Sequence, residues 1–436
     1  MKHSFRILVG MLLLAIPLCM NAQVKPKKED KKKPQQEMRG PVKPKKVDVQ
    51  EDQPMPKDKG KTVVPKKEDN PEKDKKGEKP EKKESKGGFE MPKISGFVQA
   101  MYQVNLNGNG ELASNTFNMR RVRLAVDGTL FKNLTYKIQG DFVRSPMLVD
   151  AYLKYKVCDE FSIQLGQFKT PFSLESPINP VNHELFDYGE CITKLVGYDD
   201  VCGIKAIGRD IGLMASGSFI RMKGNDGEYH IIDYAVGVFN GNGCATLENK
   251  GKDDNSRKDI VGRINVHPGL KNLTLSGSYY NGKYNKDEFN RGTRDRWAVG
   301  AQYNDGDLVV RAEYLNGYTG YQVAAFNDSV PVIDENGDQV YVEGLRNSKG
   351  FYAVAGYNFK LGKDKSQKLM PVLRYEHFEP GDVAPNVYGS TNFYTVGVSY
   401  WPLKSVNCKL DYSLIQHIEG EKTNSHRIVA MVNYKF

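Results

Sequence analysis

From residue 93 to the C-terminus, the chain consists mostly of short segments in which apolar and polar residues alternate. Leu134, Tyr136 and Ile138 share one face of such a segment, for example, and the polar residues between them share the other. A period of two is that of a β-strand whose two faces have different surroundings. The pattern predicts sixteen strands, at about 94–104, 116–128, 133–143, 147–157, 160–168, 207–222, 228–240, 257–267, 271–281, 295–304, 307–316, 350–360, 367–378, 391–401, 405–416 and 425–436.

The polar face of these strands carries many charges, and the apolar face is rich in tyrosine. The strands of a soluble β-sandwich also alternate. In a barrel that spans a membrane, however, the charged face lines an aqueous lumen and the apolar face contacts lipid, which would explain both faces. Bacterial outer-membrane barrels have an even number of strands, as predicted here. Short connections follow the even-numbered predicted strands and mostly long ones follow the odd-numbered strands, as in a barrel with short turns on one side of the membrane and long loops on the other. The predicted fold class is therefore all-β: a 16-stranded antiparallel transmembrane β-barrel over residues 93–436.

The last predicted strand ends in an aromatic residue. Its apolar face consists of Ile428, Ala430, Val432, Tyr434 and Phe436. A soluble edge strand could have the same pattern, but outer-membrane barrels end in a similar strand with a terminal aromatic residue. The fifteen strands that precede it favour the outer-membrane interpretation.

The N-terminus has the features of a secretory signal peptide. Lys2 and Arg6 precede the apolar stretch at 7–18, and Ala22 is a suitable residue before a cleavage site. This stretch is too short to span a bilayer, and no later run of about 18 apolar residues predicts a membrane helix. We therefore expect a signal peptide at 1–22 and export of the rest of the chain.

Residues 23–92 are predicted to form a disordered tether in the periplasm, rich in Lys, Pro and Glu. Residues 24–88 contain nine prolines and no aromatic residue, so they have little apolar surface to offset chain entropy. They hold 22 Lys and Arg against 14 Asp and Glu, which supplies +8 of the net charge of +10. Residues 89–436 carry 39 charges of each sign, so a basic domain that binds nucleic acid is not expected.

The segment Gly166–Glu175 has the sequence GQFKTPFSLE. This decamer resembles the hallmark of the phosphate-selective porin O and P family. Weaker similarities follow in the family's order at 120–123, 127–131, 150–153, 209–212 and 234–241. The resemblance implies a homotrimeric channel in the lipid of the outer membrane, through which small anions such as phosphate diffuse passively.

The lumen of such a barrel would be lined by the charged face of the strands. Arginine suits an anion path because its guanidinium donates two hydrogen bonds at once to a pair of phosphate oxygens. Inward-facing carboxylates such as Asp141, Glu313 and Glu376 offer an alternative, in which cross-strand ion pairs only keep the lumen polar. The candidate pore-lining residues of the anion path are Arg121, Arg123, Lys137, Lys169, Arg263, Arg311 and Arg374.

The connection 169–206 is long enough to fold into the lumen and narrow it, as such a loop does in porins that this chain resembles. It contains three lysines and six acidic residues, which argues against strong phosphate selectivity unless the acids point away from the bore. Cys191 and Cys202 lie in this loop and could form a disulfide. The predicted constriction-loop residues are Lys169, Thr170, Pro171, Phe172, Glu175 and Lys194.

No enzymatic chemistry is predicted. The histidines and cysteines lack metal-site spacing and no GxSxG element occurs, so neither a metal nor a cofactor is expected. The predicted function is an outer-membrane porin for passive diffusion of small hydrophilic solutes, with anion or phosphate selectivity left open. The alternative is a structural barrel that anchors the envelope, with residues 24–88 in contact with the cell wall.

Overall fold

The structure is a computed structural model of the 436-residue chain. The predicted signal peptide and all but the last two residues of the predicted tether lie outside the residues that it describes. The described residues are 91–204, 206–224, 227–244, 257–270, 272–285, 291–324, 326–327, 330–337, 339–362, 365–381, 389–418 and 424–436.

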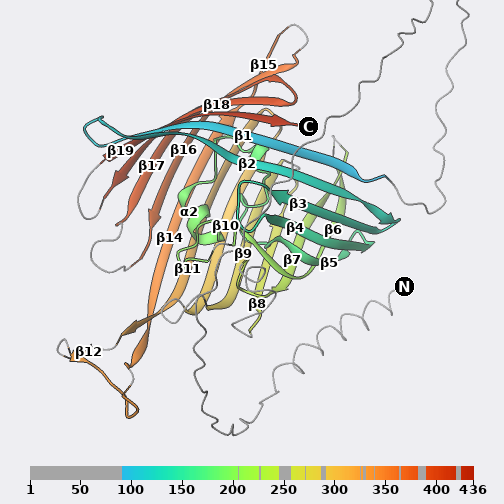
Figure 1. The fold of residues 1–436 in the computed structure, drawn as a ribbon. Coiled ribbons are helices and arrows are strands. Elements are labelled where there is room, and N and C mark those ends of the chain that lie inside the picture. Colours follow the sequence, from blue (N-terminus) through green and yellow to red (C-terminus); the bar gives the residue numbers. More distant parts are fainter. Residues whose placement is uncertain are drawn as a thin grey trace, which may run out of the picture. The chain divides into compact units, whose positions relative to one another are not determined.

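These residues form a closed barrel of antiparallel strands (Figure 1). Each strand pairs with its neighbours in the sequence, and the first strand pairs with the last to close the ring. β15 (Phe359–Leu361) pairs with the same strand as β14, in continuation of it, so the described wall has sixteen strands, as predicted. The other wall strands are β1 (Lys93–Leu106), β2 (Leu112–Phe131), β3 (Leu134–Asp141), β4 (Leu148–Cys158), β5 (Phe161–Lys169), β6 (Arg209–Gly224), β7 (Gly227–Phe239), β8 (Asp259–Val266), β9 (Leu273–Asn285), β10 (Arg291–Asn304), β11 (Leu308–Ala324), β14 (Tyr341–Tyr357), β16 (Gln367–Glu379), β17 (Thr391–Leu403), β18 (Val406–His417) and β19 (Asn424–Lys435).

The largest difference from the predicted strands lies between β11 and β14. β11 continues to Ala324 and β14 begins at Tyr341, well beyond the predicted ends of these strands. A small hairpin of β12 (Phe326–Asn327) and β13 (Val330–Pro331) lies between them. These extensions lack strict alternation, and a strand whose two faces have similar surroundings needs none.

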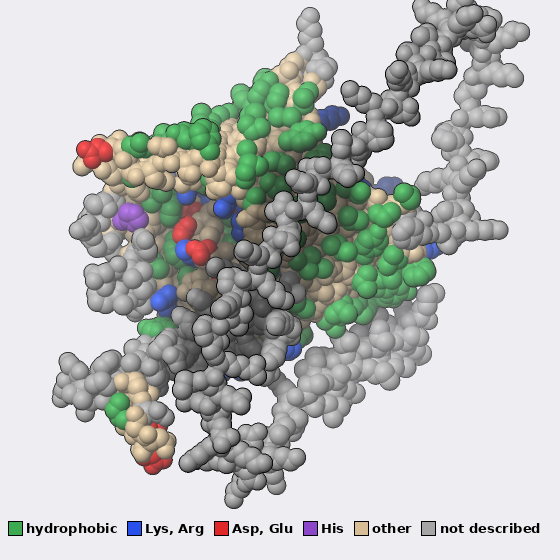
Figure 2. Space-filling model, in the orientation of Figure 1, with side chains coloured by type: hydrophobic (Ala, Val, Ile, Leu, Met, Phe, Trp, Pro, Cys, Tyr) green, Lys and Arg blue, Asp and Glu red, His purple; other side chains and the backbone are tan. Residues whose placement is uncertain are grey.

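Apolar side chains lie on the outside of the barrel and charged ones on the inside. Leu124, Ile138 and Leu153 are exposed, whereas Arg123 and Gln139, one position away from two of them, are buried. Figure 2 shows hydrophobic side chains spread over the outer face, with charged side chains clustered deeper in the opening. A β-barrel in lipid requires this arrangement, because lipid cannot solvate charge.

The connection between β5 and β6, residues 170–208, is called the inner loop here because it fills much of the barrel interior. It contains a short 3-10 helix, η1 (Pro180–Asn182), and one α-helix, α2 (Glu190–Val196), which lies inside the ring of strands in Figure 1. Neither of these helices, the only ones among the described residues, is long and apolar enough to cross a membrane.

The main apolar core of the described residues lies inside the barrel, around the inner loop. Phe172, Ile192 and Leu195 of the loop are buried together with the wall residues Leu315 and Tyr352. The loop therefore packs against the wall as a folded element, and the barrel is not an open tube at this level.

Candidate functional site

The hallmark decamer runs from the end of β5 into the inner loop, and its loop part is bound tightly to the wall. Ser173 has a positive φ of 72°, a left-handed conformation that turns the chain sharply after β5. Glu313 of β11 accepts hydrogen bonds from Ser173 Oγ (2.9 Å) and from the backbone N–H of Leu174 (2.8 Å). Arg263 of β8 donates to the carbonyl oxygen of Ser173 (2.9 Å). The second half of the decamer thus serves to dock the loop.

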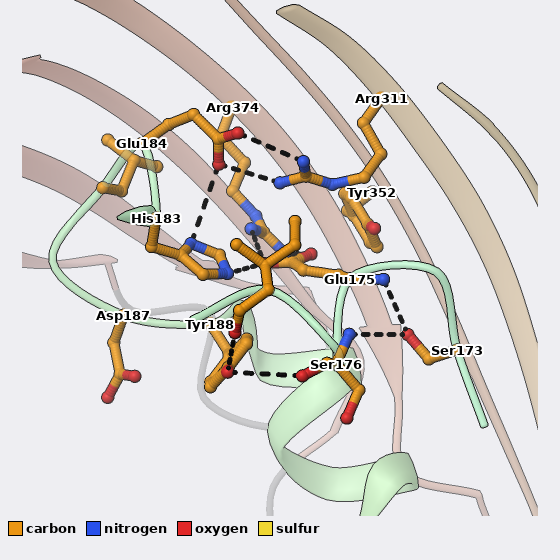
Figure 3. Close-up of polar contacts among 12 residues, drawn as sticks. Ser173, Glu175, Ser176, His183, Glu184, Asp187, Tyr188, Arg311, Tyr352 and Arg374 are labelled. Carbon is orange, nitrogen blue, oxygen red and sulfur yellow. Dashed lines mark hydrogen bonds and ion pairs between the residues drawn. The ribbon is translucent and has the colours of Figure 1, made fainter. Parts of the chain in front are cut away.

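Four acidic residues of the loop form ion pairs with arginines of the wall. Figure 3 shows two of these pairs, with Glu175 and Glu184 beside Arg374 and Arg311. The nitrogen–oxygen distances lie between 2.6 and 2.9 Å for Asp187 with Arg121, Asp200 with Arg296, Glu184 with Arg311 and Glu175 with Arg374. We call Arg121, Arg296, Arg311 and Arg374 the docking arginines.

Burial does not neutralise these loop acids. Burial alone would raise the pKa of Glu184, but Arg311 outweighs it and lowers this pKa to about 2. The same balance between burial and a facing arginine holds the pKa of Asp200 below its ordinary value. Glu184 and Asp200 are therefore carboxylates at neutral pH, and Arg311 and Arg296 balance their charge.

Wall residues on the opposite side of the inner loop add hydrogen bonds to its backbone. Lys409 of β18 donates to the carbonyl oxygens of His183 (2.6 Å) and Leu185 (2.7 Å). Asp411 of the same strand accepts from the backbone N–H of Phe186 (2.6 Å). The loop is thus fastened from β8 round to β18, and docking also involves β2.

Helix α2 sits against the wall through its N-terminal end. A Cβ on Gly189, the residue before the helix, would lie 1.9 Å from a guanidinium nitrogen of Arg374, so glycine is required for this approach. Glu376 of β16 accepts from the backbone N–H of Cys191 (2.6 Å), which satisfies one of the free donors at the helix start. Gly197 ends the helix in the left-handed conformation.

An opening is left between the inner loop and the inner face of β1 to β6. It is a cavity of about 230 Å³, bounded on the loop side by Pro177, Asn179 and Pro180. We call it the constriction cavity. Its charged lining residues are Arg123, Lys137, Asp150, Lys169 and Arg209.

The four cations of the constriction cavity differ in their partners. Arg123 Nε binds Asp141 (2.9 Å), and Arg209 Nε binds Asp150 (2.7 Å). Lys169 donates to two loop carbonyl oxygens and to the hydroxyl of Tyr188. Lys137 makes no hydrogen bond or ion pair with any residue in the described part of the chain.

The residues of the predicted anion path therefore fall into two groups. Arg123, Lys137 and Lys169 line the constriction cavity. The other four bind the inner loop: three are docking arginines, and Arg263 holds the Ser173 carbonyl. Among the predicted constriction-loop residues, those buried in the docked base of the loop are Thr170, Pro171, Phe172 and Glu175. Lys194 lies on α2 and pairs with Asp199 (2.6 Å).

The predicted disulfide between Cys191 and Cys202 is absent, since both residues are free cysteines. Cys191 lies in the main apolar core and packs against Gly350 of β14. Cys202 belongs to a separate apolar cluster, and its thiol donates to Asp200 Oδ1 (2.9 Å). The prediction was wrong because α2 and the turn after it direct the two side chains to different parts of the wall.

Sequence reasoning missed Arg120, which also binds Asp187. The pairing of β1 with β2 skips this residue, because Gln99 faces Arg121 and Ala100 faces Met119. Arg120 is therefore the extra residue of a β-bulge, which brings two consecutive arginines to the same carboxylate. The signal is visible in the sequence, since the apolar positions change phase between Met119 and Val122.

Arg209 and Arg296 were also missed as site residues. Arg209 starts β6, where the predicted strand had no clear phase, and Arg296 starts the alternating part of β10. Both have partners more than 50 residues away in the sequence, so no local pattern identifies their role.

A comparison with protein-family models finds one match, described as phosphate-selective porin O and P, over residues 93–436. The chain belongs to the porin O and P family. As a member of this family it is an outer-membrane channel for passive diffusion, and its family and fold are those of a channel. A search of curated proteins finds no match.

Solved structures similar to this porin share its barrel fold. An anion-selective porin from Comamonas acidovorans is 12% identical, with a TM-score of 0.53 over 79% of this chain and 99% of that chain. OmpF of Salmonella typhi, solved with daunomycin, is 13% identical, with a TM-score of 0.51 over 79% and 97%. The outer-membrane channel DcaP of Acinetobacter baumannii is 14% identical, with a TM-score of 0.50 over the same shares. At these identities the likeness concerns the fold alone.

Proposed function

We propose that this porin prefers anions, and that they pass through the constriction cavity beside Lys137. The observation that carries the proposal is the charge of the cavity lining, which has four cations and one carboxylate, Asp150. Arg209 pairs with that carboxylate, and Arg123 pairs with Asp141. Lys137 adds positive charge that no carboxylate bond balances.

The acidic composition of the inner loop does not oppose this proposal. Four of its acids are balanced by the docking arginines, and a fifth, Asp199, pairs with Lys194. Glu190 also lies 3.9 Å from the Lys194 ammonium. The negative charge of the loop is thus directed at the wall or at Lys194, while the loop presents Pro177, Asn179 and Pro180 to the cavity.

The test is the reversal potential of the purified protein in planar bilayers under a KCl gradient. We expect a chloride preference in the native protein and a roughly fivefold lower chloride-to-potassium permeability ratio in Lys137→Gln. The magnitude follows because a charge about 4 Å from an ion contributes about 1 kcal/mol even in water-like surroundings.

Lys132→Gln is the matched control, because Lys132 is an exposed lysine in the turn between β2 and β3, outside the cavity. Its permeability ratio should equal that of the native protein. Cation preference in the native channel, or an equal effect of both substitutions, would overturn the proposal.

We further propose that the barrel forms a homotrimer in the lipid of the outer membrane, as its resemblance to the family implies. The exposed apolar side chains on the outer face suit contact with lipid or with further copies. Residues 24–88, with an excess of eight positive charges, would lie in the periplasm and could contact the anionic cell wall. This second role is compatible with a channel.

A further inference from the structure

We propose, on the premise that the channel prefers anions, that the constriction cavity selects small organic monoanions with an apolar body over inorganic phosphate. Aromatic carboxylates are the chemical class that the cavity fits. The argument rests on the carbon surface that lines the cavity, on the hydrogen-bond donors that remain free in it, and on its size.

Much of the lining is apolar. Its carbon surface comes from four strands and the loop rim: Phe97, Tyr152, Phe168, Pro177, Pro180 and Met214. The two prolines have no N–H, so the rim offers no backbone donor at these positions. An anion with a bare polar surface would lose hydration against such residues without regaining hydrogen bonds.

Some of the donors that phosphate needs are occupied. Arg123 uses its Nε for Asp141 and lies over the ring of Phe97, with 5.7 Å from its guanidinium carbon to the ring centre. Arg209 uses Nε and one terminal nitrogen for Asp150 and the other for the Ile207 carbonyl. Each guanidinium thus commits its Nε to a wall carboxylate, and only N–H groups of the terminal nitrogens remain for a solute in the cavity.

The two lysines differ in the same respect. Lys169 has three N–H groups and three acceptors, Ser176 O (2.5 Å), Ile178 O (3.1 Å) and Tyr188 Oη (3.2 Å). It therefore has no free donor for a solute. Among the described residues Lys137 has no protein partner, so its whole ammonium can bind a solute, and a single ammonium suits one carboxylate better than a multiply charged phosphate.

The size of the cavity fits an aromatic acid. A protein cavity of about 150 Å³ can bind benzene, and the constriction cavity has about 230 Å³. Tyr152 and Phe168 meet edge to face with ring centres 5.9 Å apart, an arrangement that a third ring can extend. A carboxylate on such a ring can reach Lys137 while the ring contacts the aromatic side chains.

The experiment measures block of the chloride current of the full-length protein in planar bilayers, with sodium benzoate or sodium phosphate added at equal ionic strength. We expect benzoate to half-block at a concentration at least threefold lower than phosphate does. Met214→Ser should raise the half-blocking concentration of benzoate about threefold or more, because apolar contact area with the ring is lost. Met222→Ser, on the same strand but outside the cavity, should leave it unchanged.

The outcomes separate the two proposals. Phosphate block at the same or a lower concentration than benzoate block, with chloride preference intact, would overturn the organic-anion inference alone. A native channel without anion preference would overturn the proposed function and this inference with it. If Met214→Ser fails to fold, Pro177→Ser replaces it, because Pro177 is exposed on the loop rim. A cavity variant that folds and leaves benzoate block unchanged would also overturn the inference.

Discussion

At the scale of single residues, the buried pair of Glu184 and Arg311 is the clearest case of charge used for docking. Both oxygens of Glu184 bind the guanidinium, at 2.8 and 3.1 Å. In Glu184→Gln we expect the docked loop to lose about 3–5 kcal/mol of stability, because the substitution leaves a buried arginine without its counter-charge. Single-channel recordings should show higher and more fluctuating conductance.

The control for this substitution is Glu190→Gln, which makes the same chemical change on α2. Glu190 lies 3.9 Å from Lys194 in a partly exposed pair, and such a pair contributes only about 0–1 kcal/mol. Its conductance should match that of the native protein. Equal recordings for the two variants would show that the Glu184–Arg311 pair does not hold the loop.

The pH dependence of docking follows from the lowered pKa of Glu184. Because this pKa falls from the ordinary 4.5 to about 2 in the folded protein, its contribution to stability is complete above about pH 4.5 and is lost as the pH falls towards 2. His183, Arg311 and Arg374 face the same cluster (Figure 3). We expect conductance to be constant from pH 8 to about pH 5 and to become noisy below about pH 4. Noise that begins near pH 6 would show that a group other than Glu184 sets the pH limit of docking.

At the scale of elements, the β-bulge at Arg120 sets which side chains of β2 face lipid. Before the bulge Phe117 and Met119 are exposed, and after it Leu124 is exposed. Deleting Arg120 should restore continuous alternation and keep both halves of β2 on their present faces, since the pairing with β1 skips this residue. We expect a yield of folded barrel close to that of the native protein, measured by resistance to SDS and protease before heating.

Deleting Asn109 is the matched control. This residue is exposed in the turn between β1 and β2, beyond the paired segments. One residue is lost there without a change of phase in either strand. A folded yield of the Arg120 deletion far below that of the Asn109 deletion would mean that the extra residue of the bulge is needed for the register of β2.

The same elements show what the sequence can predict. Alternation located all sixteen wall strands, because the surroundings of each face act on every second residue. Sequence patterns could not locate α2, because the helix is only seven residues long and its buried residues are few: Cys191, Ile192, Leu195 and Val196. Nor could it pair Glu175 with Arg374, 199 residues away, since no local pattern records which strand a loop will meet. For the same reason the sequence could not show that three of the arginines predicted for the anion path bind the inner loop as docking arginines.

At the scale of the whole molecule, the position of charge matters more than its sum. Residues 89–436 carry 39 charges of each sign, and residues 24–88 hold an excess of eight positive charges. If selectivity arises in the constriction cavity, deleting residues 24–88 should leave the chloride preference unchanged, although it removes most of the net charge. Raising KCl from 0.1 to 1 M should weaken the preference, because the screening length falls from about 10 Å to about 3 Å.

This deletion also distinguishes the channel from the envelope anchor. A barrel that lacks residues 24–88 but conducts with native selectivity, and no longer sediments with isolated cell wall, would have both roles in separate parts of the chain. Deletion that abolishes the chloride preference would locate selectivity in the N-terminal segment, since a cavity beside Lys137 would keep its own potential. The salt dependence independently distinguishes selectivity in the cavity from selectivity in the N-terminal segment. Charges that line a narrow cavity stay within a few ångströms of the solute, so salt screens them less than it screens charges on a distant segment.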